Sequence, residues 1–365
     1  MRRRALLGAG IGAAAGAAGA ALSRPALAQM RTEWRMVTAW PKDLPGLGTG
    51  AERFSRRVAE MSGGRLIIRV YASGELVPPL QGFDAVANGT AEVYHGFAAH
   101  HDGKSKAFGF FTAVPFGFDA GEHAAWIRHG GGQKLWDELC EPFALKPLLC
   151  GNTGPAMAGW FRKEIRKPED LKGLKVAAIG FSGPVLASLG ATPVALGLTQ
   201  IESAIESKDV DAAEGFGPTI DLALSLFKGM RFYYGPGVQQ PAAEVELLIA
   251  KSKFDALPAE LRSIVEVAAG AENDEVLAEL TLRGGPALQI LTKQLGVQIR
   301  QMPKEVLVAQ GNAAGALLKE LAEDKDPVVK KVAQVYVAAR REMAPWTAIG
   351  DQGFLEARRL RIAYP

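Results

Sequence analysis

One short stretch holds residue types from which a phosphate loop, a nucleophilic serine or the wall of a ligand pocket could be built. In LKGLKVAAIGFSGPVL (171–186), an apolar strand runs into Gly180-Phe181-Ser182-Gly183, and a helix is expected to follow. A phosphate loop is disfavoured because the stretch lacks Gly-Lys-Ser/Thr and G-x-G-x-x-G. A nucleophile elbow needs glycine two residues on each side of the serine, and Pro184 occupies the second position. Glycines at a strand end more often permit a tight turn.

The five histidines do not have metal-site spacing. None forms an i, i+4 pair and there is no HExxH. His95 and His100 flank the loop after the third predicted strand, where open α/β sheets bind ligands. We therefore expect these two near a pocket, and ordinary hydrogen-bonding roles for His101, His123 and His129.

Glu214, in DAAEGFGP (211–218), is the one carboxylate that the pattern singles out. It ends a predicted strand in apolar surroundings. A carboxylate there either contacts a ligand or pairs with a buried donor. No pair of acids is arranged as a general acid and base, and Trp126, Trp136 and Trp160 are expected in the core.

Cys140 and Cys150 are the only cysteines. An oxidising compartment would allow a bridge. A predicted helix end near Cys140 and a predicted strand around Leu148 and Leu149 would hold the two too far apart. We predict two buried thiols.

Strands and helices alternate along most of the chain, which is typical of α/β architecture with largely parallel sheet. A strong strand over 243–250 (AEVELLIA) would return the chain to the first lobe, and the chain is mostly helical from Leu257. The expected architecture is two α/β lobes joined by two crossing strands, with long C-terminal helices. The predicted strands are 34–40, 66–71, 91–97, 157–162, 174–179, 193–196 and 210–216, and the predicted helices are 51–61, 81–87, 184–189 and 200–207.

The N-terminus has the pattern of an export signal. Arg2, Arg3 and Arg4 precede an apolar, glycine-rich run, and Ala26-Leu27-Ala28 suits a signal peptidase. Arg3-Arg4 followed by Ala-Leu-Leu is typical of a twin-arginine signal, cleaved after Ala28. A membrane anchor is the alternative, disfavoured by the glycines and the cleavage site. The signal predicts export to the periplasm.

Length and charge limit the partners. The 365 residues, of which 22% are charged, suffice for one large or two medium domains with real cores. The signal contains four arginines and no acid, so the formal charge of +3 becomes −1 once it is removed. Neither nucleic acid nor an anionic membrane is therefore favoured as a partner.

Several stretches, taken in order, resemble the solute-binding proteins of tripartite ATP-independent periplasmic (TRAP) transporters. They are GGGQKLWDEL (130–139), LKPLLCGNTGPAMAGWFRKEI (145–165), KPEDLKGLKV (167–176), LGATPVAL (189–196) and DVDAAEGFGPTIDLAL (209–224). The branch most similar is the one that binds 2-oxo acids. The resemblance implies a type II-like periplasmic solute-binding fold, a non-enzymatic role, small carboxylates as usual solutes and a membrane permease as partner. APWTAIGDQGFLEAR (344–358) resembles the C-terminal helix that makes that branch dimeric.

The resemblance also implies a domain division and a homodimer. The signal peptide would occupy 1–28, and residues 326–365 would form the dimerisation helix and tail. Lobe I would comprise 29–150 with part of 243–290, and lobe II 151–242 with part of 290–325.

Within this resemblance the opening stretch departs from the family. The family places an arginine that grips the ligand carboxylate where this chain has Ala177. Ala156 replaces a glutamine that binds the branch's metal, Gly215 replaces a tryptophan, and Gln240 replaces an acid. Calcium or sodium wants several oxygen ligands. We therefore expect the metal site to be lost or weakened, with no cofactor.

The expected ligand site follows from the polar residues that this chain retains, without the arginine and with fewer metal ligands. Such a pocket suits a neutral, amide-bearing or cationic solute. Three alternatives stay open: a small monocarboxylate or 2-oxo acid held by a substitute basic residue such as Arg162, an exported sensor that reuses the fold without transport, and a hydrolase using Ser182. The predicted ligand-binding residues are Glu214, Asn152, Gln239, Gln240, His95, His100, Phe181 and Ala177.

Overall fold

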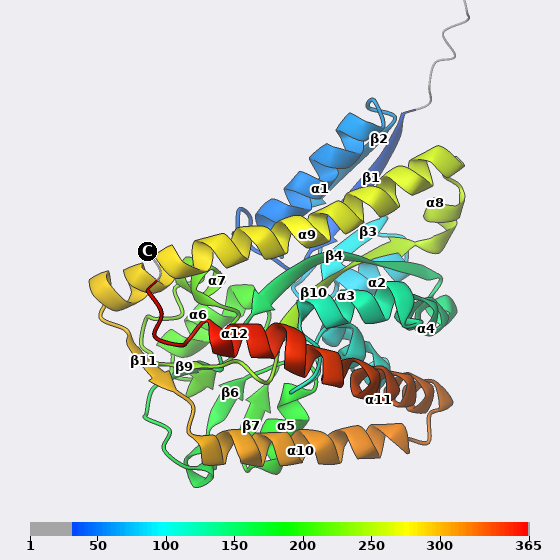
Figure 1. Cartoon of the computed structure of the whole chain (residues 1–365). Coiled ribbons are helices and arrows are strands. Elements are labelled where there is room, and N and C mark those ends of the chain that lie inside the picture. Colours follow the sequence, from blue (N-terminus) through cyan, green and yellow to red (C-terminus); the bar gives the residue numbers. More distant parts are fainter. Residues whose placement is uncertain (1–30, 364–365) are drawn as a thin grey trace, which may run out of the picture.

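The structure is a computed structural model that describes residues 31–363, whose strands form two separate sheets (Figure 1). The predicted signal over 1–28 lies outside the described residues. No helix within 31–363 is long and apolar enough to cross a membrane.

The first sheet has the strand order β2-β1-β3-β10-β4. β1 (Thr32–Thr38) is parallel to β2 (Leu66–Tyr71) and to β3 (Val93–Gly96). β10 (Ala242–Ala250) is antiparallel to β3 and to β4 (Leu145–Pro155). The sheet is therefore parallel where the βαβ pattern predicts it, and antiparallel where the crossing strands enter.

Four helices of the N-terminal half accompany this sheet: α1 (Gly48–Met61), α2 (Gly82–Ala87), α3 (Ala120–His129) and α4 (Gly132–Cys140). The expected apolar face of α1 packs at Phe54 and Val58, which are fully buried, but Met61 at the helix end stays 43% exposed. Cys140 ends α4 and Cys150 lies within β4. Both are free, buried thiols, as predicted.

The second sheet has the strand order β11-β9-β5-β8-β6-β7. It is mixed, because β6 is parallel to β7 and β8 while β5 is antiparallel to β8 and β9. Its strands are β5 (Gly159–Phe161), β6 (Lys175–Ala177), β7 (Thr192–Val194), β8 (Ala212–Ala213), β9 (Phe232–Gly235) and β11 (Gln298–Gln301), and the α-helices among them are α5 (Ser182–Ser188), α6 (Leu198–Glu206) and α7 (Pro218–Ala223).

One long helix, α9 (Ala259–Gln289), runs diagonally past both sheets, and residues 290–294 continue it as a π-helix (Figure 1). Its Glu272 side chain is fully buried, and its carboxylate contacts the guanidinium of Arg53 at 2.7 Å and that of Arg57 at 3.0 Å, both on α1. Burying that carboxylate is tolerable because two cations face it. The ion cluster fixes α9 against the first lobe.

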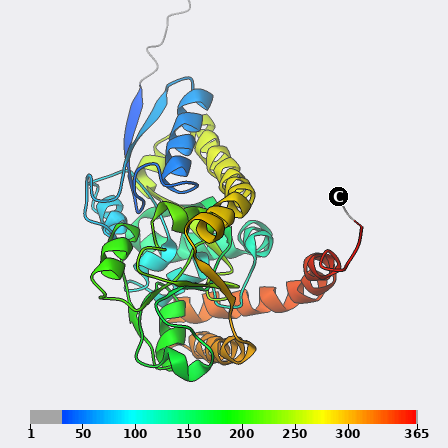
Figure 2. The same ribbon diagram turned by 90° about the vertical axis from the view of Figure 1, so that its left-hand side faces the viewer.

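The C-terminal helices follow β11. α10 (Lys304–Ala322) packs against α11 (Pro327–Thr347), which is capped by the Asp326 side chain and has a proline in its first turn. A short π-helix (Ala348–Gln352) and α12 (Gly353–Ala357) extend α11 into an arm that projects away from the body (Figure 2). The remaining helices are α8 (Lys251–Asp255) and the 3₁₀ turns Ala98–His101, Lys106–Phe111, Glu141–Phe143 and Pro168–Leu171.

The predicted strands and helices are largely present, and the differences have physical reasons. The strand predicted over 210–216 is reduced to Ala212–Ala213, because the residues after it leave the ladder and enter the site described below. β4 continues unbroken past residue 150, where the first lobe was expected to end, so the division into lobes stays a prediction. The three tryptophans expected in the core are buried, each with an exposed fraction of at most 1%.

Candidate functional site

The opening stretch forms one side of the candidate site. β6 ends at Ala177, and the chain turns at Gly180, whose φ of 59° lies in the left-handed region. Glycine reaches that region without the steric cost that a Cβ brings. The turn at Gly180 therefore lets α5 begin close to the end of β6. This agrees with the expectation that the glycines permit a tight turn.

Glu214 is brought to the same place by β8, the neighbour of β6. The backbone N–H of Glu214 donates to the Ala177 carbonyl at 3.0 Å. The residues that follow are held by Asp221, whose carboxylate accepts from the Phe216 N–H at 2.9 Å. The same carboxylate accepts from Trp160 at 3.0 Å and from the Tyr233 hydroxyl at 2.6 Å, which fixes the segment after Glu214 to the sheet.

The Glu214 carboxylate is buried with half of its hydrogen-bonding capacity unused. Oε2 accepts from Gln240 Nε2 at 3.1 Å and from the Ile179 N–H at 3.4 Å, while Oε1 has no partner among the described residues. Burial raises the pKa of Glu214 from 4.5 to about 7, although the hydrogen bonds from the Ile179 N–H and Gln240 oppose that rise. Because buried acceptors are normally hydrogen-bonded, an unpaired one indicates a position where a ligand atom could donate a hydrogen bond.

A small cavity of about 20 Å³ lies against Glu214. Ala177, Glu214 and Phe216 line it from the second lobe and His100 from the first. A void of this size holds about one water molecule. Little free space therefore remains beside Glu214, and no lysine or arginine is among the residues that line it.

His100 lines this cavity and has one identified hydrogen-bond partner. Its Nδ1 lies 2.9 Å from the Tyr94 hydroxyl. Burial, with a smaller contribution from His101, lowers the pKa of His100 to about 3, so the ring is neutral. A neutral imidazole that accepts the Tyr94 proton at Nδ1 carries its own proton on Nε2. In that tautomer the ring can donate a hydrogen bond from Nε2.

Aromatic contacts across the two lobes close the cleft on either side. Phe97 of the first lobe stacks on Phe216 of the second, with ring centroids 5.9 Å apart and planes 7° from parallel. Phe181 packs edge-on against Phe110 at 4.8 Å. Phe181 does not line the cavity; it contributes to the seal between the lobes.

Three predicted site residues are engaged elsewhere in the protein. His95 accepts from Trp40 Nε1 at 2.7 Å, and its Nε2 lies 3.2 Å from the Cys150 carbonyl. Asn152 donates to Glu244 at 2.5 Å, and Gln239 donates to the carbonyls of Met157 and Ala158. The structure thus brings together Ala177, Glu214, His100 and, through its hydrogen bond to Glu214, Gln240.

Arg162, the suggested substitute for the missing arginine, does not line the cavity either. Its guanidinium donates to the backbone carbonyls of Ile205, Val210 and Gly229. Ser182 is 1% exposed, and its hydroxyl donates to the Ile179 carbonyl at 2.8 Å. No histidine hydrogen-bonds this serine in the described part of the chain, so it lacks the base that activates a serine nucleophile.

Two buried glutamates on β10 were not anticipated. Glu244 contacts Asn152 and lies 3.8 Å from His123 Nδ1, and Glu246 lies 2.6 Å from His101 Nε2. Burial raises the pKa of Glu244 to about 8 and that of Glu246 well above its usual value. The signal was present in AEVELLIA, where two acids interrupt an apolar strand, because acids inside such a strand require polar partners.

Over residues 31–363, no group of three or more His, Cys, Asp or Glu side chains is arranged to hold a metal ion. At the candidate site, the Glu214 carboxylate and the Gln240 amide lie in hydrogen-bond contact, 3.1 Å from Oε2 to Nε2. Calcium takes six to eight oxygen ligands, usually with more than one carboxylate. The residues present do not fit such an ion.

Comparisons with known proteins identify the family of this chain. Residues 36–325 match the family model described as bacterial extracellular solute-binding protein, family 7. A monocarboxylate 2-oxoacid-binding periplasmic protein of Nostoc sp. is 36% identical over 321 residues, which cover 88% of this chain and 87% of that protein. The chain belongs to this family, which comprises the solute-binding receptors of TRAP transporters and is not enzymatic.

Two solved structures match the fold closely. A TRAP solute-binding protein from Bordetella bronchiseptica, with calcium and picolinate bound, has a TM-score of 0.87 and 34% identity, covering 90% of this chain and 97% of its own. One from Pseudoalteromonas atlantica, with sodium and pyruvate, has a TM-score of 0.86 and 35% identity, covering 89% and 99%. The predicted two-lobed α/β fold and the resemblance to the 2-oxo-acid branch are confirmed.

The buried Glu214 predicts a pH-dependent stability. The native state keeps a proton that the unfolded chain loses above about pH 4.5, so the free energy of unfolding falls as pH rises from there to about 7. In Glu214→Gln this contribution is absent. Urea unfolding should show the variant more stable than wild type at about pH 8, by on the order of 3 kcal/mol, with a much smaller difference at about pH 5.

The matched control is Glu52→Gln, which changes an exposed carboxylate on α1. It should leave the pH profile of wild type unchanged. A difference between Glu214→Gln and wild type that is the same at both pH values would show that Glu214 titrates normally.

Proposed function

We propose that this protein is the receptor that captures a small organic solute beside Glu214, where the cavity of about 20 Å³ must widen to admit it, and delivers the solute to a TRAP permease. Glu214 Oε1, buried without a partner where the two lobes close, is the observation that carries the proposal. A receptor of this kind needs a polar group whose hydrogen bond is completed by the solute. Glu214 supplies the acceptor, His100 the donor, and Ala177 and Phe216 the apolar walls.

The solute class follows from the charges around the cavity. The relatives are named for monocarboxylate 2-oxo acids or hold pyruvate or picolinate with a metal ion. Here an anionic solute would meet the Glu214 carboxylate with no lysine or arginine in the lining. Burying two like charges together is costly. We infer a solute that presents a neutral amide or a cation to Glu214.

Thermal shift with a solute panel tests both the receptor role and the charge of the solute. Amides or amines should raise the melting temperature at saturation, because a ligand that binds only the native state stabilises it by mass action. Glu214→Gln should weaken that binding by roughly tenfold or more, as expected for a lost charge-assisted hydrogen bond. Ala195→Ser, outside the lined cavity, is the control.

Two results would change the proposal. If no amide, amine, acid or aromatic compound shifts the melting temperature, the receptor role loses its support. If pyruvate binds at pH 6 and its affinity falls as Glu214 ionises near pH 7, the solute is a small monocarboxylate bound beside a protonated Glu214. A sensor without transport remains the second candidate, and a gene neighbourhood without permease genes would favour it.

We further propose that the mature receptor acts in the periplasm after twin-arginine export and cleavage behind Ala28, as the sequence of residues 1–28 suggests. The family is extracytoplasmic, which supports this location. Determining the N-terminal residue of the protein from a periplasmic extract tests the cleavage site.

The absence of a tight metal site is a separate part of the proposal. Glu214 and Gln240 offer too few oxygens for calcium, so purified protein should contain far less than one calcium per chain and keep its melting temperature in EDTA. Ala156→Gln with Gln240→Glu adds an amide oxygen and a carboxylate near Glu214, and this double variant should gain affinity for calcium. Stoichiometric calcium in the wild type by mass spectrometry would contradict the proposal.

A homodimer through the C-terminal arm is also proposed. Trp346, Ile349 and Phe354 on the arm are 73%, 77% and 61% exposed, although α11 itself is anchored to the body by buried Tyr336 (Figure 2). Large apolar side chains exposed together mark an interaction surface.

Ile349→Asp with Phe354→Asp places charges on this surface without touching the anchored part of α11. Light scattering coupled to gel filtration should then report a monomer where wild type is a dimer, because a charge buried in the interface is costly. Val308→Asp, exposed on α10, is the matched control and should leave the dimer intact. A variant that remains dimeric would show that the arm is not the interface.

A further inference from the structure

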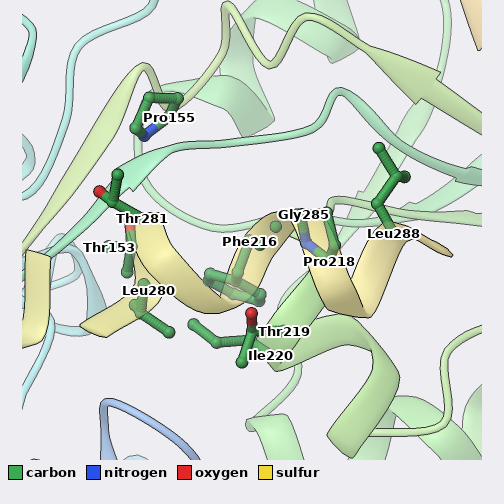
Figure 3. Close-up of a pocket in the computed structure, with 12 residues that line it drawn as sticks. Thr153, Pro155, Phe216, Pro218, Thr219, Ile220, Leu280, Thr281, Gly285 and Leu288 are labelled. Atoms are coloured by element: carbon green, nitrogen blue, oxygen red, sulfur yellow. The ribbon is translucent and has the colours of Figure 1, made fainter. Parts of the chain in front are cut away.

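A second and larger cavity, of about 280 Å³, lies between the end of β4, α7 and the C-terminal half of α9 (Figure 3). Phe216, Ile220, Leu280 and Leu288 form its apolar walls, and no charged side chain lines it. The cavity is partly open to solvent at Thr281 and Gly285, and an ionised group placed against its apolar walls would find no partner there. The cavity therefore suits an uncharged, apolar ligand group.

Phe216 connects this cavity to the Glu214 site, because it is the one residue that lines both. It stands between Gly215 and Gly217, and Gly217 has a φ of 135° that residues with a Cβ rarely adopt. Glu214 is only two residues away. A group that displaces the Phe216 ring passes from one cavity into the other.

The wall supplied by α9 is open because two glycines stand there. A Cβ on Gly284 or Gly285 would meet no atom within 4 Å. Gly284, Gly285 and Pro286 are consecutive poor helix formers inside a 31-residue helix, and each glycine costs about 1 kcal/mol relative to alanine. Helix stability does not explain their presence, whereas the space they leave does.

Thr219 adds a polar feature to the apolar wall. Its side-chain oxygen is buried and has no hydrogen-bond partner among the described residues. Figure 3 shows this oxygen directed toward the Phe216 ring. Buried hydroxyls normally find a partner, so a ligand atom near Phe216 would complete this one.

From these observations we propose that the solute is amphipathic, with its polar head at Glu214 and His100 and an uncharged aryl or branched alkyl end in the cavity beyond Phe216. This inference rests on the proposed receptor function and adds the class of solute. An engineered apolar cavity of roughly 150 Å³ accommodates benzene, so the space present is sufficient for a substituted ring.

Calorimetric titration of the full mature chain with two probe pairs tests the proposal: acetamide against phenylacetamide, and pyruvate against phenylpyruvate. In at least one pair the aryl member should bind about tenfold or more tightly than its small counterpart, since it buries a ring. Gly284→Leu fills the cavity and should remove this advantage while leaving the small probe unchanged. Gly315→Leu, at an exposed glycine inside α10 with similar open space, should retain it.

The outcomes separate the two proposals. If acetamide or pyruvate binds and depends on Glu214 but the ring confers no advantage, the solute is small and only this inference fails. If the aryl advantage persists in Gly284→Leu, the ring lies elsewhere and the inference is again wrong. If none of the four probes binds, both this inference and the proposed head-group recognition are overturned.

Discussion

The antiparallel ladder between β4 and β10 is the constraint on which both lobes depend. It runs from Leu145 paired with Ala250 to Pro155 paired with Ala242, with irregular register around Glu244. β4 leads from the first sheet toward β5 of the second, and β10 brings the chain back from β9, so the two connections between the sheets are held side by side by backbone hydrogen bonds. At the irregular register, Glu244 accepts from Asn152, and a polar pair stands where the regular ladder is interrupted.

The electrostatics of the interior follow from the scarcity of buried cations. Glu272 is matched by two arginines and holds α9 in place. Glu214, Glu244 and Glu246 have no such partners, and burial raises the pKa of each, while it lowers the pKa of His95, His100, His101 and His123 to between about 3 and 4. Both kinds of group move toward their neutral forms, because low dielectric disfavours charge of either sign. The surroundings of the site are therefore polar but carry little charge, and Glu214, with a pKa of about 7, is about half ionised at neutral pH.

Local pattern was sufficient for much of the fold and for part of the site. The strand predicted over 66–71 coincides with β2, and AEVELLIA lies within β10, because apolar runs bounded by breakers have few alternatives. β9 was missed because its four residues lead into Gly235-Pro236-Gly237, which has the composition of a loop. Glu214 was recognisable as an acid at a strand end. The hydrogen bonds of Asn152 to Glu244 and of His95 to Trp40 were not recognisable from the sequence, because the partners are 92 and 55 residues apart.

The departures from the family at the site belong together physically. A Cβ on Gly215 would lie 2.8 Å from the Asp221 carboxylate and 3.2 Å from Met157 Cβ, so a larger side chain there would require a neighbour to shift. Asp221 cannot move away, because Trp160 and Tyr233 hold it. Gly237 likewise lies against the backbone of Ala156. Packing is thus close around Gly215 and Gly237, and the larger free volume lies beyond Phe216. A solute larger than the relatives' pyruvate is accommodated there only if it turns an apolar end toward α9.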